Sequence, residues 1–241
     1  MATFVLVHGA FHGAWCWVKL QPELEARGHR VLTMDMPGCG KEGTPLHQVS
    51  LDACVSRIGE SLERAGTNVI LVGHSMGATL AAQAAERHRA RIRRLVFLAG
   101  VIPRDGESLY TLLQILADPA AEVKPMPPPG DPWDGPFQEP ARDKASDIFY
   151  NDCSAEDIAF ALPLLCRQAN APRLAPLRLS AEFYRLPRAF IGCARDNANT
   201  PARQRATLAM FPCDQELSLP TGHSPFFSQP ALLAATLAGL A

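Results

Sequence analysis

Short apolar runs alternate with amphipathic segments over the first hundred residues. The apolar runs have the length and the branched side chains of buried strands, and they cover residues 3–7, 29–35, 69–72 and 95–99. The segments between them repeat apolar side chains at helical spacing, at residues 20–27, 51–64 and 76–87. Gly28 and Gly66 follow two of these segments and are natural helix stops. The alternation predicts an α/β fold with a parallel sheet covered on both faces.

The same pattern returns near the C-terminus after an irregular middle. Residues 188–193 and 215–220 are strand-like, a helical segment lies between them, and residues 230–240 predict a closing helix. In the middle, helical spacing appears only near residues 154–167 and 180–184. The two late strands join the four early ones, so we expect a sheet of about six strands, mainly parallel.

The irregular middle is dense in proline. Residues 118–140 include the run PMPPPGDP, which excludes regular structure there. We interpret residues 103–187 as a lid inserted after the fourth strand, with residues 1–102 and 188–241 forming one core. The alternative is a loose linker between two domains. The C-terminal segment is too short for an independent α/β domain, which favours the lid.

Composition narrows the class of protein. A chain of 241 residues with 47% hydrophobic side chains can bury the core of one α/β domain. The net charge of −1 gives no reason to expect nucleic acid or a membrane surface as partner. No run is long enough to span a bilayer and no signal-peptide pattern opens the chain, so we expect a cytoplasmic protein. Seven scattered cysteines show no C-x-x-C spacing, and we expect reduced thiols, no metal and no cofactor.

One serine lies where a predicted strand meets a predicted helix. Ser75 is the centre of Gly73-His74-Ser75-Met76-Gly77, which fits G-x-S-x-G. A serine on such a turn exposes its hydroxyl, and glycine two positions either side avoids collisions with neighbouring backbone. The alternative is a serine that caps the following helix. The strand-to-helix context favours a nucleophile.

A serine nucleophile needs a base and an acid, and both occur later in the chain. His223 follows the last predicted strand, and Asp196 follows the fifth, in the order Ser, Asp, His. Asp105, after the fourth strand, is the competing acid. The oxyanion donors should be the backbone N–H groups of Met76, next to the nucleophile, and of Ala10, in the loop after the first strand. In that loop we expect the two histidines, His8 and His12, to brace the backbone through hydrogen bonds.

Several stretches resemble one branch of the α/β-hydrolases, the plant methylesterase and hydroxynitrile lyase group: FVLVHGAFHGAWCW, LEARGHRVLTMDMPGCG, VILVGHSMGA and VFLAGVIP. The resemblance resumes at FIGCARDNANTP and GHS, where Asp196 and His223 fall on the acid and base of the family. In the lid, FYNDCSAEDIAFALPLL looks like lids of bacterial carboxylesterases, some of them similar to aryl- and pyrethroid-ester hydrolases. The resemblance implies the α/β-hydrolase fold, and a homodimer is common in this group.

The resembled group contains two chemistries. Its lyases carry threonine after the first-strand histidine, lysine after the catalytic histidine and Glu-Ser-Cys at the nucleophile. This chain has Gly9, Ser224 and His74-Ser75-Met76 at these positions, so the resemblance favours a serine carboxylesterase. A hydroxynitrile lyase and a slow-turnover small-molecule receptor stay open as alternatives.

The expected substrate is a small apolar aryl or alkyl ester. The side chains that we expect to line its pocket are apolar or aromatic, and most belong to the lid. They are Phe11, Trp133, Phe149, Tyr150, Phe160, Leu162 and Leu165.

Overall fold

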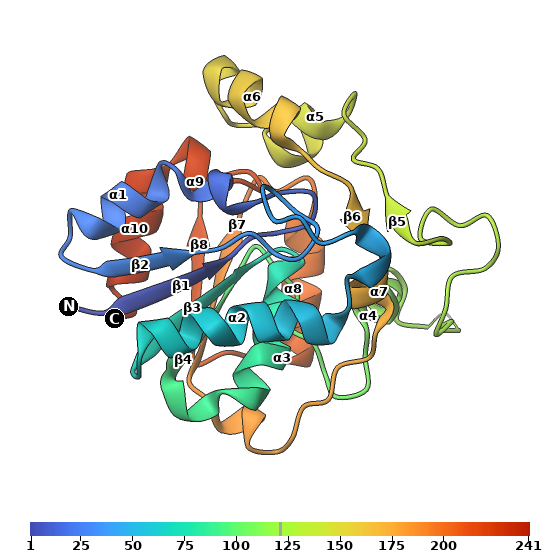
Figure 1. Cartoon of the computed structure of the whole chain (residues 1–241), viewed down its shortest axis with the longest axis horizontal. Helices are drawn as coiled ribbons and strands as arrows, with labels where there is room; N and C mark the ends of the chain where they lie inside the picture. The colour runs from blue at the N-terminus through green and yellow to red at the C-terminus, as the bar shows by residue number, and fades with distance from the viewer. Residues whose placement is uncertain (121) are drawn as a thin grey trace.

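A six-stranded sheet forms the centre of the computed structural model, which describes residues 1–120 and 122–241 (Figure 1). All neighbouring strands in it run parallel. The strand order is β2 (Arg30–Thr33), β1 (Thr3–Val7), β3 (Val69–His74), β4 (Ile92–Leu98), β7 (Arg188–Cys193) and β8 (Gln215–Leu219). The prediction of six parallel strands is therefore confirmed.

Alternate residues of the central strands enter two separate hydrophobic cores. In β1, Val5 and Val7 belong to one core while Phe4 and Leu6 belong to the other. This follows from the two-residue period of a strand, whose successive side chains point to opposite faces. Every residue of β3 is buried, as expected for the middle of a parallel sheet covered on both sides.

Helices cover both faces of the sheet (Figure 1). One core is covered by α2 (Leu51–Ala65), α3 (Gly77–Arg87) and α8 (Pro201–Met210). The other core is covered by α1 (Leu20–Glu25), α9 (Pro225–Ser228) and α10 (Pro230–Ala238), and α1 and α10 contact each other. Ser50 caps α2 by accepting a hydrogen bond from the N–H of Ala53. Among the described residues, no helix has both the length and the hydropathy needed to cross a membrane.

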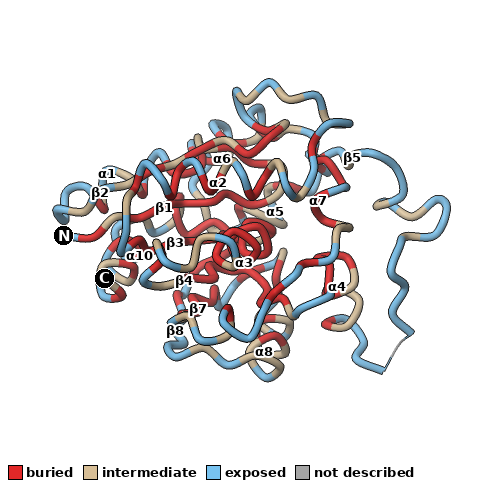
Figure 2. The backbone as a smooth tube through the Cα atoms, turned by 60° about the horizontal axis from the view of Figure 1, so that its bottom comes forward, coloured by how far each residue is buried: buried red, intermediate tan, exposed pale blue. Residues whose placement is uncertain are grey.

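The chain between β4 and β7 forms short elements. They are α4 (Leu109–Ala117), β5 (Phe137–Gln138), α5 (Ala145–Phe149), α6 (Ala155–Ala161), β6 (Gln168–Ala169) and α7 (Ala171–Leu174). β5 and β6 pair antiparallel in a small second sheet. Figure 2 shows the long loop between α4 and β5 as mostly exposed, and Ala121 in this loop lies outside the described residues.

In the middle of the chain, several observed elements differ from those that the sequence predicts. Helix α4 has no counterpart among the helices that the sequence predicts, although its N-terminus carries a capping box at Ser108. The helix predicted near residues 180–184 is wrong, because only one 3-10 turn, Phe183–Arg185, forms there. Ser180 instead donates backbone and side-chain hydrogen bonds to Glu86, which fixes an extended connection. A single pair, Phe137–Gln138, interrupts the predicted irregular stretch of residues 118–140.

Candidate active site

Ser75 lies on a sharp turn between β3 and α3. Its backbone has a φ of 53°, the left-handed region that costs a non-glycine residue about 1–3 kcal/mol. Its N–H donates to the carbonyl of Leu98 at the end of β4. A Cβ at Gly73 would lie 2.6 Å from the Cα of Ala78, so glycine is required on this side of the turn. The N-cap residue of α3 is Met76, and no side chain caps the helix, so Ser75 does not serve as its cap.

His223 and Asp196 meet at the carboxyl edge of the same sheet. His223 follows β8 and Asp196 follows β7, and the His223 Nδ1 to Asp196 Oδ2 distance is 2.8 Å. Both residues are 1% exposed. The other carboxylate oxygen, Oδ1, accepts the N–H groups of Ala198 and Asn199, both at 2.8 Å. Because the carboxylate is acceptor-only, Nδ1 of His223 must carry the proton, which leaves Nε2 able to accept one.

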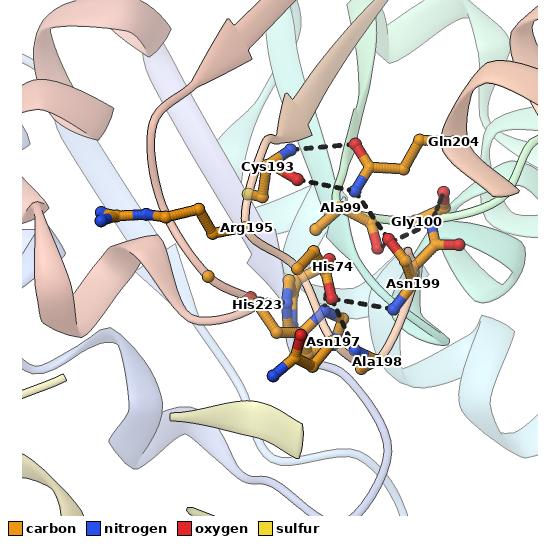
Figure 3. A network of polar contacts seen from close by, with 12 residues as sticks. His74, Ala99, Gly100, Cys193, Arg195, Asn197, Ala198, Asn199, Gln204 and His223 are labelled. Carbon is orange, nitrogen blue, oxygen red and sulfur yellow. Dashed lines mark hydrogen bonds and ion pairs between the residues drawn. The ribbon is translucent and has the colours of Figure 1, made fainter. Parts of the chain in front are cut away.

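The loop that carries Asp196 is tied down on both sides, as Figure 3 shows. Asn199 donates from Nδ2 to the carbonyls of Ala99 and Gly100, after β4. Gln204 of α8 accepts the N–H of Cys193 and donates to its carbonyl. The competing acid, Asp105, is exposed and accepts the N–H of Leu179, so the structure brings Asp196 rather than Asp105 to His223.

His74, the residue before Ser75, supports the loop that carries His223. His74 Nε2 donates to the His223 carbonyl at 2.9 Å, and the two ring centroids are 4.6 Å apart. Burial lowers the pKa of His74 well below its ordinary value, so its ring is neutral. From the sequence, His74 is recognisable only as the residue before Ser75. Its role as a support depends on a carbonyl that is 149 residues away along the chain.

Ser75 and His223 form no hydrogen bond with each other within the described chain. Contacts between a nucleophile and its base are often longer in structures without substrate and shorten in the complex.

Two backbone N–H groups next to Ser75 have no partner in the described part of the chain, those of Ala10 and Met76. Both residues line one cavity together with Ser75. Unpaired backbone donors beside a nucleophile are suited to a negatively charged oxygen. These are the two donors that the sequence nominates.

The loop that carries Ala10 is held by the two histidines in the expected way. His8 accepts the N–H of Met36 at Nε2, and its Nδ1 donates to the Gly9 carbonyl at 2.8 Å. His12 accepts the Tyr150 hydroxyl at Nε2, and its Nδ1 donates to the Ala10 carbonyl at 2.7 Å. Burial lowers the pKa of His8, and it lowers that of His12 to about 3. Both rings are therefore neutral and positioned by hydrogen bonds rather than by charge.

The cavity beside Ser75 has a volume of about 130 Å³. Its apolar wall includes Leu109 and Leu113 of α4, and Val101 after β4. Two charged side chains also line it, Arg173 and Arg203. An engineered cavity of about 150 Å³ admits benzene, so this one has room for a group the size of one ring.

None of the seven side chains predicted to line the pocket lies on this wall. Tyr150 is fully buried and bonded to His12, and Leu165 is buried in packing. Phe160 is 42% exposed and lines a different cavity with Trp15, while Leu162 packs against the hydrophobic core that contains Tyr150. Three of the seven lie beside His223 or Arg173 instead.

Those three are aromatic. The ring of Phe149 lies 5.9 Å from that of His223. The rings of Trp133 and Phe11 lie 3.6 and 5.9 Å from the Arg173 guanidinium carbon. The sequence analysis did not predict that Arg173 or the side chains of α4 line the cavity. For Arg173 the only signal in the sequence is a single arginine among prolines, in ANAPRLAPL.

No cysteine of the described residues lines the cavity beside Ser75. Within residues 1–120 and 122–241, no group of three or more His, Cys, Asp or Glu side chains could hold a metal ion. All seven cysteines are free thiols.

Comparison with known proteins relates the whole chain to one family. A family model described as the alpha/beta hydrolase family matches residues 4–236. Methylesterase 1 of Arabidopsis thaliana is 32% identical, over 96% of this chain and 92% of that protein. The chain spans only 61% of the longer putative methylesterase 11 from the same plant, at 30% identity.

Solved structures give the same picture. The crystal structure of the methylesterase MES16 from Arabidopsis has a TM-score of 0.83 and 28% identity, covering 100% of this chain and 98% of that one. A pyrethroid hydrolase from Sphingobium faniae JZ-2 has a TM-score of 0.81 and 25% identity, covering 99% and 96%.

Proposed function

Since the chain belongs to the alpha/beta hydrolase family, we propose that it is a serine carboxylesterase that cleaves small carboxylic esters through Ser75, His223 and Asp196. Relatives with 30% identity or more are named as methylesterases, which supports carboxylic ester hydrolysis as the reaction. The observation that carries the proposal is the setting of Ser75, which shares one cavity with the unpartnered N–H groups of Ala10 and Met76.

In the first half of the proposed reaction, Ser75 Oγ attacks the ester carbonyl. His223 Nε2 accepts the hydroxyl proton while Nδ1 stays bonded to Asp196. The carbonyl oxygen becomes an anion that accepts hydrogen bonds from the N–H groups of Ala10 and Met76. Each such donor contributes about 3–4 kcal/mol to the transition state. His223 then protonates the departing alcohol.

In the second half, water releases the acid from the acyl-enzyme. The same histidine removes a proton from the water, and the oxyanion donors act again. In this proposal residues 103–187 form the lid. Its α5 places Phe149 against the His223 ring, and the N–H of Cys166 donates to the Phe11 carbonyl at 2.9 Å. Both contacts support a lid over the carboxyl edge of the sheet, which would exclude bulk water.

A hydroxynitrile lyase is the main alternative enzyme. Gly9 and Ser224 occupy the positions where the resembled lyases carry threonine and lysine, and Ser224 is fully buried. An ester hydrolase needs no lysine there, because its leaving group is an alcohol that His223 can protonate. These two positions favour the esterase.

Hydrolysis of p-nitrophenyl acetate and a panel of methyl, aryl and longer acyl esters tests the proposal. We expect Ser75→Ala and His223→Ala each to lower kcat by about 10⁴-fold or more. Ser56→Ala, at an exposed position of α2, is the matched control and should retain full activity. If the wild-type protein bound an aromatic acid tightly but hydrolysed no ester faster than Ser75→Ala, it would be a receptor. Release of cyanide from mandelonitrile that depends on Ser75 would instead establish a lyase.

A further inference from the structure

A buried arginine lies in the same cavity as Ser75. Arg173 belongs to α7, which packs beside α4 at one end of the sheet (Figure 1). It is 6% exposed, although arginine is almost never this deeply buried without a charged partner. The proposed mechanism does not use it.

The contacts of the guanidinium leave one edge without a partner. Nη1 donates to Gln138 Oε1 at 2.7 Å and to Asn170 Oδ1 at 3.0 Å. One face of the group lies over the Trp133 ring. Nε is buried and has no hydrogen-bond partner, and Nη2 donates no hydrogen bond within the described chain. Nε and Nη2 together form the edge that binds a carboxylate through two parallel hydrogen bonds.

No carboxylate of the described residues forms an ion pair with Arg173. Burial alone lowers its pKa, to about 9, so the group is still a cation at neutral pH. Two amide oxygens and an aromatic face compensate part of the desolvation, but none of them neutralises the charge. A buried charge of this kind is compensated best by an anion from outside the chain.

The rest of the cavity favours an anion as well. Among the described residues, the other charged side chain on its wall is Arg203, whose Nη1 donates to the Ala198 carbonyl. The carboxylate of the proposed triad, Asp196, already accepts three hydrogen bonds and is not part of the wall. The part of the wall that Leu109 and Leu113 form is apolar, which suits a short hydrocarbon between two polar ends.

We propose that the substrate of this esterase is a half-ester of a small dicarboxylic acid, whose free carboxylate pairs with the Nε–Nη2 edge of Arg173 while its ester carbonyl lies at Ser75. This inference rests on the proposed function and gives it a substrate class. Hydrolysis of a monomethyl ester then consumes one water and yields the diacid, as a dianion, with methanol and one proton. The cavity volume of about 130 Å³ limits the acid to a few carbon atoms or one ring.

Matched substrates test the proposal. The monomethyl esters of succinic, glutaric and adipic acid are compared with the same esters whose free carboxylate is replaced by a carboxamide of the same shape. We expect the wild-type kcat/KM to favour the best half-ester about 10- to 100-fold, the usual value of a charge-assisted hydrogen bond.

Variants assign the preference to Arg173. Arg173→Gln should reduce the ratio of the two kcat/KM values to about one, and Arg173→Lys should keep part of it, because lysine retains the charge but not the fork. Arg178→Gln, at an exposed position four residues beyond α7, is the control and should keep the full ratio. If the wild-type protein has the same kcat/KM for the half-ester and for its carboxamide analogue, the proposal is overturned. This comparison does not depend on whether Arg173→Gln folds. An unchanged ratio in folded Arg173→Gln would overturn the proposal too.

Binding of the diacid separates this inference from the proposed function. Calorimetry with glutarate and the Ser75→Ala protein measures the anion site without catalysis. Suppose that the wild-type protein hydrolyses no ester, while Ser75→Ala binds glutarate and Ser75→Ala/Arg173→Gln does not. This result would refute the esterase and support the anion site. Suppose instead that neutral esters are hydrolysed in a way that depends on Ser75, with no preference for half-esters and no binding of glutarate. This result would support the esterase and refute the anion site.

Discussion

At the scale of single residues, the His223 ring is fixed by what surrounds its two nitrogens. Nδ1 faces a carboxylate oxygen that can only accept, while the second oxygen of Asp196 is occupied by two backbone N–H groups. The carboxylate therefore cannot rotate without breaking those bonds. One tautomer results, with Nε2 available as a base.

Asp196→Asn tests this arrangement directly. The asparagine oxygen must stay at the two backbone donors of Ala198 and Asn199, so its NH₂ group faces His223 and donates to Nδ1. The ring is then forced into the opposite tautomer, whose Nε2 carries a proton and cannot act as a base. We expect kcat for a simple ester to fall about 10⁴-fold with little change in stability. Asp105→Asn, at the exposed competing aspartate, should leave the rate within about twofold of wild type, and a loss equal to that of Asp196→Asn would contradict the assignment.

Gly9 matters because of the space that a side chain would occupy. A Cβ at Gly9 would lie 2.9 Å from His74 Nδ1 and 3.0 Å from Ser75 Cβ, both closer than normal contact. Gly9→Ala should therefore displace the nucleophile or the oxyanion loop and lower kcat/KM about 10- to 100-fold. Gly43→Ala, where a Cβ meets nothing within 4 Å, is the matched control in the same esterase assay. Equal activity of the two variants would show that the loop tolerates displacement.

At the scale of elements, α3 must begin very close to β1. A Cβ at Gly77, the first residue of α3, would lie 2.7 Å from the Val7 carbonyl and would also overlap the His8 carbonyl. Both atoms belong to the backbone at the end of β1, so they cannot turn aside as a flexible side chain would. The second glycine of the motif is therefore needed to pack a helix on a strand, as well as to expose the serine.

Gly77→Ala should accordingly lower the stability of the whole protein. Overpacking against fixed backbone costs about 1–3 kcal/mol, which for a chain of this size corresponds to a fall in Tm of about 3–10 °C. Gly239→Ala is the comparison, since its Cβ makes only ordinary contacts of 3.4 Å or more at the end of α10, and its Tm should stay within about 2 °C of wild type. Thermal unfolding followed by circular dichroism decides, and an unchanged Tm in Gly77→Ala would disprove the close contact.

At the scale of the whole molecule, three neutral histidines lie buried under the site. Burial lowers the pKa values of His8, His12 and His74 in the folded protein, while in the unfolded chain they return to about 6.5. Below pH 6.5 the unfolded state therefore binds protons that the folded state does not. The free energy of unfolding falls as the pH falls, starting near 6.5 and continuing, for His12, towards about 3.

Each buried histidine contributes at most about 1.4 kcal/mol per pH unit in this range, so the three together give up to about 4 kcal/mol per unit. Urea unfolding at pH values between 7.5 and 4.5 should show this slope begin near pH 6.5. His12→Gln should remove about one third of it, and His47→Gln, at an exposed histidine, should leave it unchanged. A free energy of unfolding that stays constant between pH 6.5 and 5 would contradict the neutral, buried state.

The sequence predicts the strands well and the middle of the chain poorly, for a physical reason. Strands such as Thr3–Val7 and Arg188–Cys193 are apolar on both faces and bounded by turn residues, so their pattern is local. The turn at Phe183–Arg185 depends on a distant segment, as the hydrogen bonds from Ser180 to Glu86 show. Helix α4 carries a local capping box but packs against α7 and α8, which come later in the chain. No local pattern contains such contacts.

By itself the sequence determined the order of strands and helices, the strand-to-helix context of Ser75 and the positions of Asp196 and His223 after their own strands. It could do so because apolar period, glycine positions and residue order are properties of the chain itself. Only the tertiary structure decided that His74 supports the His223 loop, that α4 rather than the predicted aromatic side chains forms the cavity wall, and that Arg173 is buried there without a carboxylate. These depend on which side chains meet across the folded molecule, and burial gives them their energetic weight.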